Sequence, residues 1–212
     1  MAPGDSTTDG FQGQPGSSTE NPGAVDANAR YPDHLAGRLA GSGRTDLGVI
    51  NAGISGNQLV SSARPSQSFG RSARARFAVD VLAVPGVTDV IIFIGSNDIG
   101  HRSGVSAAKV VRAKKKLIVR AHDAGLRLHL ATMPSTGGAC GGMGSAKTDR
   151  IRREINRWTR EQRLSDSVVD FDRALRDPAK PSRLRPADDS GDHAHTSAAG
   201  YAPRPARCGS AG

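Results

Sequence analysis

The chain has 212 residues, a mass of 22.0 kDa and a formal net charge of +9, and this length suits a single domain with a sizeable core. The basic charge is compatible with nucleic-acid binding, but the arginines are spread along the chain and aromatic residues make up only 4% of it, too few for base stacking. No stretch approaches the roughly 18 apolar residues that span a bilayer, and the first residues lack the basic and then apolar pattern of a secretory signal, so the compartment stays open.

The first half of the chain alternates between helical and strand patterns. Residues 10–27 are rich in Gly, Pro, Ser and Thr, which predicts a surface loop. Residues 28–41 have helical spacing, and the apolar run at 47–51 predicts a short strand. Helical spacing returns at 71–84. Residues 87–94, VTDVIIFI, show little alternation, which is typical of a strand buried on both faces in a parallel sheet.

The same alternation continues through the second half. The predicted elements are a helix at 105–124, a strand at 126–134, an amphipathic helix at 146–164 and a strand at 167–171. The basic run RAKKK at 112–116 lies within the first of these helices, where we expect a solvated face. Strand–helix alternation with buried strands predicts a three-layer α/β/α fold with a doubly wound parallel sheet.

In such folds, ligands bind at the carboxyl ends of the strands, and here those ends carry NAGISGN, GSND and MPSTGG. Ester hydrolysis by serine requires a hydroxyl, an imidazole, an orienting carboxylate and donors for the oxyanion. Ser6 offers the hydroxyl, His195 the imidazole, and Asp192, three residues earlier, the carboxylate. The candidate oxyanion donors are the backbone N–H groups of Ser6 and Gly53 and the side-chain amide of Asn97.

Taken singly, each of these residues has another explanation. Ser6 fits an ordinary turn, Gly53 the end of a strand and Asn97 an Asx turn. The acidic and histidine cluster at 188–195 fits a solvated turn or a metal site, although no further His or Cys pattern accompanies it. The two cysteines of the chain allow at most one disulfide.

The order of the motifs is a more specific signal. GDSTTDG, NAGISGN, GSND and DHAH resemble, in this order, the four sequence blocks of the SGNH/GDSL hydrolase family, and the resemblance runs from about Gly4 to Tyr201. The intervening sequence is similar to the arylesterase/acylhydrolase-like branch, whose members are typically secreted and occur in polysaccharide-degrading systems. The stretches that carry this likeness are ARYPDHLAGRL, FAVDVLAVPGVTDVIIFIGSNDIG, VVDFDRALRDPAKPSRLRPADDSGDH and AAGY.

This resemblance implies a flavodoxin-like fold and a role for each site residue. Ser6 would be the nucleophile, His195 the general base and later the general acid, and Asp192 the partner that orients His195. His193 would support the turn. No metal and no organic cofactor would be required. The oxyanion hole would be formed by Ser6 N–H, Gly53 N–H and the Asn97 side chain.

The implied function is that of a serine esterase acting on small acyl esters, either acetyl groups on plant polysaccharides or aryl esters. The first alternative is a non-catalytic remnant that keeps the motifs without their geometry. The second is a basic protein that binds nucleic acid or another anionic surface. For the leading interpretation, we expect a small-molecule or carbohydrate ester as the substrate and no nucleic-acid partner.

The start of the chain departs from the family pattern. Family members carry an apolar strand directly before the GDS block, whereas only three residues precede Gly4 here, and Pro3 has no backbone donor for a sheet. We therefore expect the first strand to be missing. The corresponding hypothesis is that Met1 is not the natural start, or that the chain is a truncated or decayed copy.

The end of the chain departs as well. Thr196 follows the candidate base where the family usually has proline. Beyond Tyr201, Pro203 and Pro205 argue against the terminal helix of the family. We expect the hydrolase domain to span residues 1–201, the last helix to be missing and residues 202–212 to be a disordered tail.

Overall fold

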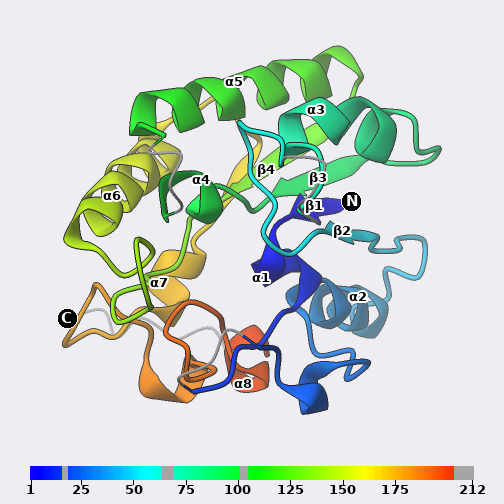
Figure 1. The fold of residues 1–212 in the computed structure, drawn as a ribbon. Helices are drawn as coiled ribbons and strands as arrows, with labels where there is room; N and C mark the ends of the chain where they lie inside the picture. The colour runs from blue at the N-terminus through cyan, green and yellow to red at the C-terminus, as the bar shows by residue number, and fades with distance from the viewer. Residues whose placement is uncertain (16–18, 64–68, 101–104, 203–212) are drawn as a thin grey trace, which may run out of the picture.

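A computed structural model describes residues 1–15, 19–63, 69–100 and 105–202 of the chain. Five parallel strands form its centre (Figure 1). They are β1 (Ala2–Gly4), β2 (Asn51–Gly53), β3 (Asp89–Ile92), β4 (Arg127–Ala131) and β5 (Ser167–Val169). β1 pairs with β2, and β3, β4 and β5 pair in that order. A parallel bridge from Gly4 to Phe93 joins the two groups, so the strands lie in the order β2–β1–β3–β4–β5.

Helices cover both faces of the sheet (Figure 1). One face packs against α3 (Ala73–Phe77), the π-helical turn η2 (Ala78–Leu82), α5 (Ala107–Asp123) and α6 (Ala146–Glu161). The other face packs against α2 (Tyr31–Gly41), α7 (Phe171–Leu175) and α8 (Ala198–Tyr201). Short turns follow the strands or lie in loops: α1 (Ser6–Asp9), η1 (Pro22–Ala24), α4 (Ser96–Gly100) and η3 (Pro186–Asp188). The predicted three-layer, doubly wound fold is confirmed.

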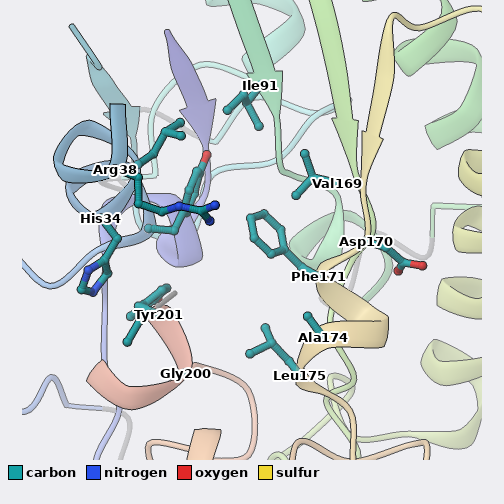
Figure 2. A pocket seen from close by; sticks show the side chains of 13 residues that line it. His34, Arg38, Ile91, Val169, Asp170, Phe171, Ala174, Leu175, Gly200 and Tyr201 are labelled. Carbon is teal, nitrogen blue, oxygen red and sulfur yellow. The ribbon is translucent and has the colours of Figure 1, made fainter. Parts of the chain in front are cut away.

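The alternation of side chains along β3 explains the two cores. Val90 and Ile92 are fully buried in the larger core, beneath α5 and α3. Ile91 points to the opposite face, where it lines a cavity of about 420 Å³ between α2, α7 and α8 (Figure 2). Because both faces of the strand meet apolar side chains, the run VTDVIIFI shows no alternation in sequence.

The first strand is present, and the expectation that it is missing is wrong. β1 has three residues, all of them buried, and lies between β2 and β3 rather than at an edge. Ala2 N donates to Ile50 O at 2.8 Å on one side, and Met1 O accepts from Ile91 N at 2.9 Å on the other. Pro3 removes one donor from this strand, while Met1, Ala2 and Gly4 supply the remaining pairing.

Other boundaries differ less from the expectation. β2 begins at Asn51, the last residue of the predicted strand at 47–51. A four-residue helix, α8, ends at Tyr201. The predictions of a disordered tail at 202–212 and of a missing last helix stay predictions, because residues 203–212 lie outside the described residues. Cys208 is among these residues. Cys140 is exposed.

The expectation of a solvated basic run in α5 is wrong at one position. Arg112, Lys115 and Lys116 are exposed, but Lys114 is fully buried. Lys114 lies four residues after Val110 and three before Leu117, on the helix face that packs on the sheet. Within the described part of the chain, no helix is long and apolar enough to cross a membrane.

Candidate active site

Ser6 is the first residue of α1 and lies two residues after the end of β1. The residue between them, Asp5, is buried and caps the helix, because its side chain accepts the N–H of Thr7 at 3.1 Å. Ser6 is therefore fixed by the central strand on one side and by a capped helical turn on the other. This places its hydroxyl at the carboxyl end of the sheet.

Residues from the far end of the chain meet Ser6 there. His195 Nε2 lies 2.9 Å from Ser6 Oγ, although 189 positions separate the two residues. His195 Nδ1 lies 2.6 Å from Asp192 Oδ2. The structure thus brings together the three residues predicted as nucleophile, base and orienting carboxylate, in the order that proton transfer from the hydroxyl to the imidazole requires.

Asp192 is held as a carboxylate. Its Oδ1 atom accepts the backbone N–H groups of Ala194 and His195, both at 2.9 Å, and the hydroxyl of Ser190 at 3.1 Å. Burial alone would raise the pKa of Asp192, but the hydrogen bond and charge of His195 and these backbone donors outweigh it and lower the pKa to about 2. An ionised Asp192 stabilises the Nδ1–H tautomer of His195, which leaves Nε2 free to accept the proton of Ser6.

The loop at 10–27 packs against this arrangement, and the sequence did not predict that contact. The ring of Phe11 lies 4.7 Å from the ring of His195, centroid to centroid. Gly13 lies against Asp192, since a Cβ atom at Gly13 would collide with the carboxylate. Gln12 between them is buried. The loop therefore packs against two of the three residues, and only its interaction partners in space reveal this role.

Asn97 lies on α4, just after β3, and is buried beside Ser6 and His195. Its side-chain Nδ2 donates to Asn57 O at 2.9 Å. Together with Ser6 and His195 it lines a cavity of about 120 Å³, to which Pro134, Thr136, Met143 and Ala194 also contribute. The predicted amide donor therefore faces the same small space as the hydroxyl and the imidazole.

The backbone N–H of Gly53 already takes part in a hydrogen bond. Its N–H donates to Asn51 Oδ1 at 2.9 Å, and a Cβ atom at Gly53 would collide with the backbone of α1 at Asp9. Gly56, three residues later, has a φ of +75° and directly precedes Asn57, whose carbonyl holds Asn97. Among the described residues, nothing accepts the N–H of Gly56. The predicted role of Gly53 as an oxyanion donor stays a prediction, and Gly56 is a second candidate for that role.

Three buried charges lie beneath the site. Asp98 accepts the N–H groups of Leu59 at 2.7 Å and Val60 at 2.8 Å, and its burial raises its pKa to about 6 against these hydrogen bonds. Burial likewise raises the pKa of Asp5 to about 6. Lys114, whose Nζ donates to Ala131 O at 3.4 Å, has its pKa lowered by burial to about 8, while the charges of Asp98 and Asp5 oppose that shift. Asp98 thus ties the segment just after Asn57, at Leu59 and Val60, to the turn that carries Asn97.

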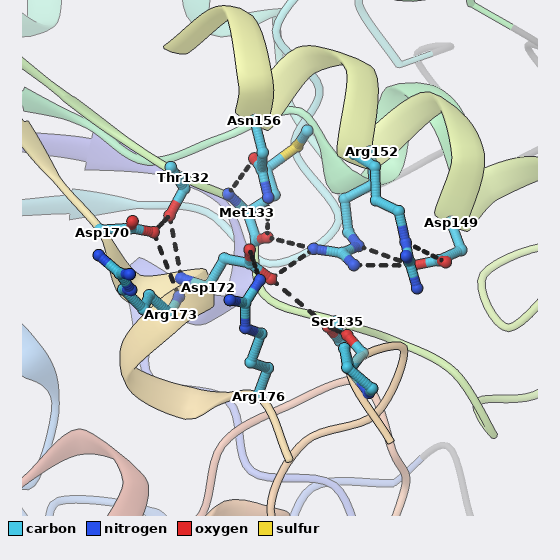
Figure 3. A network of polar contacts seen from close by, with 12 residues as sticks. Thr132, Met133, Ser135, Asp149, Arg152, Asn156, Asp170, Asp172, Arg173 and Arg176 are labelled. Atoms are coloured by element: carbon cyan, nitrogen blue, oxygen red, sulfur yellow. Dashed lines mark hydrogen bonds and ion pairs between the residues drawn. The ribbon is translucent and has the colours of Figure 1, made fainter. Parts of the chain in front are cut away.

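A second polar network fixes the carboxyl end of β4 (Figure 3). The side chain of Asn156 accepts the N–H of Met133 and donates to its carbonyl, both at 2.8 Å. Arg152 donates to the same carbonyl at 3.2 Å and pairs with Asp172 at 2.6 Å. Because Pro134 follows directly and lines the small cavity, this network positions one wall of the site.

The cluster predicted as a possible metal site at 188–195 is organised differently. Asp192 and Asp189 each bind a histidine of the same turn, and Asp188 pairs with Arg185. Within the described residues, no group of three or more His, Cys, Asp or Glu side chains is arranged to hold a metal ion. The larger apolar cavity of Figure 2 is lined by neither Ser6 nor His195, so it is separate from the site.

Comparison with solved structures places the fold among known esterases. An aryl esterase of M. smegmatis superposes with a TM-score of 0.73 at 15% identity, over 94% of this chain and 91% of that one. A carbohydrate acetylesterase from Sinorhizobium meliloti gives 0.70 at 17% identity over the same shares. A protein from Desulfitobacterium hafniense assigned to the lipolytic G-D-S-L family gives 0.65 at 22% identity, again over 94% and 91%. At these low identities, the TM-scores show similarity of fold alone.

No curated protein matches the chain in sequence. The model of the GDSL-like lipase/acylhydrolase family, however, matches residues 2–202, which is nearly the whole described chain. This match includes every block that suggested the SGNH/GDSL resemblance. The chain therefore belongs to the GDSL-like lipase/acylhydrolase family and is a carboxylic ester hydrolase by that membership.

Proposed function

We propose that the chain is a serine esterase that removes small acyl groups, acetyl groups above all, from carbohydrate or aryl esters through an acyl-enzyme. The observation that carries the proposal is the hydrogen-bonded series Ser6–His195–Asp192, with distances of 2.9 and 2.6 Å. The cavity beside Ser6, about 120 Å³, is well below the roughly 300–1,000 Å³ of a site for a larger ligand. It suits an acyl group of few carbons.

The first half of the reaction transfers the acyl group to the protein. His195 Nε2 takes the proton of Ser6 as Oγ bonds to the ester carbonyl carbon. The carbonyl electron pair moves to oxygen, where Ser6 N–H, Gly56 N–H and the Asn97 amide donate hydrogen bonds. The intermediate then collapses, the bond to the alcohol oxygen breaks, and His195 gives its proton to the leaving alcohol.

The second half returns the protein to its initial state. A water molecule loses a proton to His195 as its oxygen bonds to the acyl carbon, and the resulting intermediate breaks its bond to Ser6 Oγ. Ser6 Oγ takes the proton back and a carboxylic acid leaves. Asp192 keeps its charge throughout and stabilises the imidazolium form of His195 in both halves.

The substrate class draws support from the structural neighbours, which include an aryl esterase and a carbohydrate acetylesterase. The cavity beside Ser6 supports the same substrate class, because a long acyl chain would extend beyond it. Hydrolysis of p-nitrophenyl acetate, butyrate and octanoate should therefore fall with chain length. A preference for octanoate would contradict the small-acyl part of the proposal.

Substitution of the nucleophile tests the mechanism. Ser6→Ala should lower kcat for p-nitrophenyl acetate by about 10⁴-fold or more, with an unchanged circular dichroism spectrum. Ser42→Ala is the matched control, because Ser42 is exposed and its hydroxyl donates to Leu39 O, one turn earlier and away from the site. A folded Ser6→Ala variant that hydrolyses the ester at the original rate would refute the role of Ser6. A folded native chain without activity would favour the non-catalytic remnant.

A further inference from the structure

A second carboxylate–imidazole pair lies on the same turn as His195. His193 Nδ1 is 2.6 Å from Asp189 Oδ2, and Asp189 Oδ1 accepts the N–H of His193 at 3.0 Å and that of Gly191 at 2.8 Å. Asp192 and His195 are joined in the same two ways. The side chain of His193 is 45% exposed, however, against 20% for His195. The protein thus orients a second imidazole and leaves it open to solvent.

The backbone of His193 is in an unusual conformation. Its φ is +63°, and only two other non-glycine residues in the described part of the chain have a positive φ. This left-handed conformation is unfavourable for a residue with a Cβ atom and persists only where the surroundings hold it. Here Asp189 holds both the main chain and the ring. Glycine would adopt this conformation without strain, so support of the turn alone does not require histidine.

The ring of His193 lies at the border of the candidate site. The next two residues, Ala194 and His195, line the cavity beside Ser6. On its other side the ring packs on Gly138, where an added Cβ atom would lie 3.2 Å from the ring carbons. Gly138 belongs to the loop that contributes Thr136 and Met143 to the same cavity. His193 therefore belongs to one segment that lines the cavity and packs against the other.

The position of His193 relative to His195 indicates which part of a substrate it meets. His195 must deliver its proton to the leaving alcohol oxygen, so the alcohol portion of the ester lies on the side of His195. With Nδ1 engaged by Asp189, the proton of neutral His193 lies on Nδ1 and Nε2 is an acceptor. None of the described residues bonds to Nε2. A hydroxyl group of the alcohol portion fits this acceptor.

We propose that His193, oriented by Asp189, binds a hydroxyl group of the alcohol portion of the ester and thereby favours esters of sugars over esters of phenols. The proposal rests on the esterase function proposed above and names its specificity residue. It assigns His193 to substrate binding rather than to proton transfer, since His195 already performs that step.

The test compares two substrates that carry the same acyl group. One is a monoacetylated methyl xyloside, which has free hydroxyls beside the ester, and the other is p-nitrophenyl acetate, which has none. His193→Gly removes the imidazole and suits the positive φ. The ratio of kcat/KM for the xyloside over that for p-nitrophenyl acetate should fall about tenfold, mainly through KM for the xyloside, the loss expected for one hydrogen bond. Asp189→Asn should change the ratio in the same direction.

His122→Ala is the matched control. It removes an imidazole that pairs with a carboxylate, Asp166, at 2.9 Å and is 42% exposed, at the far end of α5. It should leave the ratio as in the native chain. A ratio unchanged in His193→Gly, or an equal fall of kcat for both substrates, would overturn the proposal. The same holds if the native chain hydrolyses p-nitrophenyl acetate through Ser6 but not the xyloside. Hydrolysis that persists in Ser6→Ala would instead refute the esterase mechanism itself.

Discussion

Asp98→Asn should remove a loss of stability that the native protein undergoes between acidic and neutral pH. Asp98 is fully buried, and burial raises its pKa from 3.8 to about 6 in the folded chain. Folding therefore favours the protonated, neutral carboxyl. Asparagine has nearly the same shape and stays neutral at every pH, so it avoids the unfavourable ionisation of a buried group. Its amide offers one acceptor oxygen where the two carboxylate oxygens accept the N–H groups of Leu59 and Val60, so the variant also carries a cost that does not change with pH.

The size of the effect follows from the shift. The difference between about 6 and 3.8 corresponds to about 3 kcal/mol at about 1.4 kcal/mol per pKa unit. Between these two pH values the unfolded chain binds fewer protons at Asp98 than the folded chain does. The stability of the native protein therefore falls as the pH rises through this window, and the contribution is fully lost above pH 6. The variant lacks this loss.

Urea denaturation at pH 4, 6 and 8 measures the difference, with the fluorescence of the single tryptophan, Trp158, as the signal. We expect the unfolding free energy of the Asn variant, relative to that of the native protein, to be about 3 kcal/mol higher at pH 8 than at pH 4. Asp46→Asn, at an exposed residue paired with Arg44, is the control and should show no such rise. A difference that is constant with pH, or that turns further against the variant at pH 8, would contradict the raised pKa of Asp98.

Three further substitutions test the surroundings of the site. Asp192→Asn should lower kcat for p-nitrophenyl acetate by about 10⁴-fold, because the amide no longer selects the Nδ1–H tautomer of His195; a loss below tenfold would contradict that role. Gly13→Ala should lower kcat at least tenfold, since its Cβ atom would displace Asp192 and small displacements at a reacting centre reduce rates by about 10²-fold; native kinetics in a folded variant would argue against it. Arg152→Met should lower the unfolding free energy by about 3 kcal/mol, as expected when a buried carboxylate, here Asp172, loses a partner. Urea denaturation would measure this loss, and a value under about 1 kcal/mol would show that the neighbouring arginines of Asp172 compensate.

Part of the site could be predicted because of the way parallel sheets are built. NAGISGN, GSND and MPSTGG each followed a predicted strand, and the carboxyl ends of neighbouring strands meet at one edge. No strand was predicted directly before the motifs of Ser6 and His195, so their pairing was expected from the order of the motifs and the family resemblance, and the structure places their side chains 2.9 Å apart. Asn97, in GSND, follows β3 and joins them because of that common edge.

The buried charges were harder to predict, because residue type and position pointed in opposite directions. Lys114 lies in a basic run, which favours a solvated face. Yet its spacing from Val110 and Leu117 places it on the apolar face of α5, and position decided the outcome. Asp98 likewise follows Asn97 in an apparent turn. Its hydrogen bonds reach back about 40 positions, to Leu59 N, and no local pattern encodes such a contact.

The choice between Gly53 and Gly56 also required the structure. Both glycines lie in NAGISGN, and from the sequence alone either of them could approach the oxyanion closely. The contacts of Asn51 favour the second glycine, because its side chain accepts the N–H of Gly53 while its own amide donates to Thr8 O at 2.8 Å. The first glycine is thus used to join β2 to α1, and the second lies in the turn next to the carbonyl that holds Asn97.

The shortness of β1 does not leave the nucleophile without an anchor, since several independent contacts hold a strand of three residues. Ala2 N donates to Ile50 O at 2.8 Å, and the strand pairs in parallel with both neighbours. At its carboxyl end, the buried guanidinium of Arg76 donates to Gly4 O at 3.0 Å and also to a carbonyl of β2 at 2.8 Å. This arginine comes from α3, on the far side of the sheet from α2, so the strand end is held from outside the sheet plane as well as within it. Hydrogen bonds to a charged group are stronger than neutral ones, and this one lies two residues before Ser6. The position of the nucleophile therefore depends less on the length of its strand than on how completely the backbone groups at the end of that strand are bound.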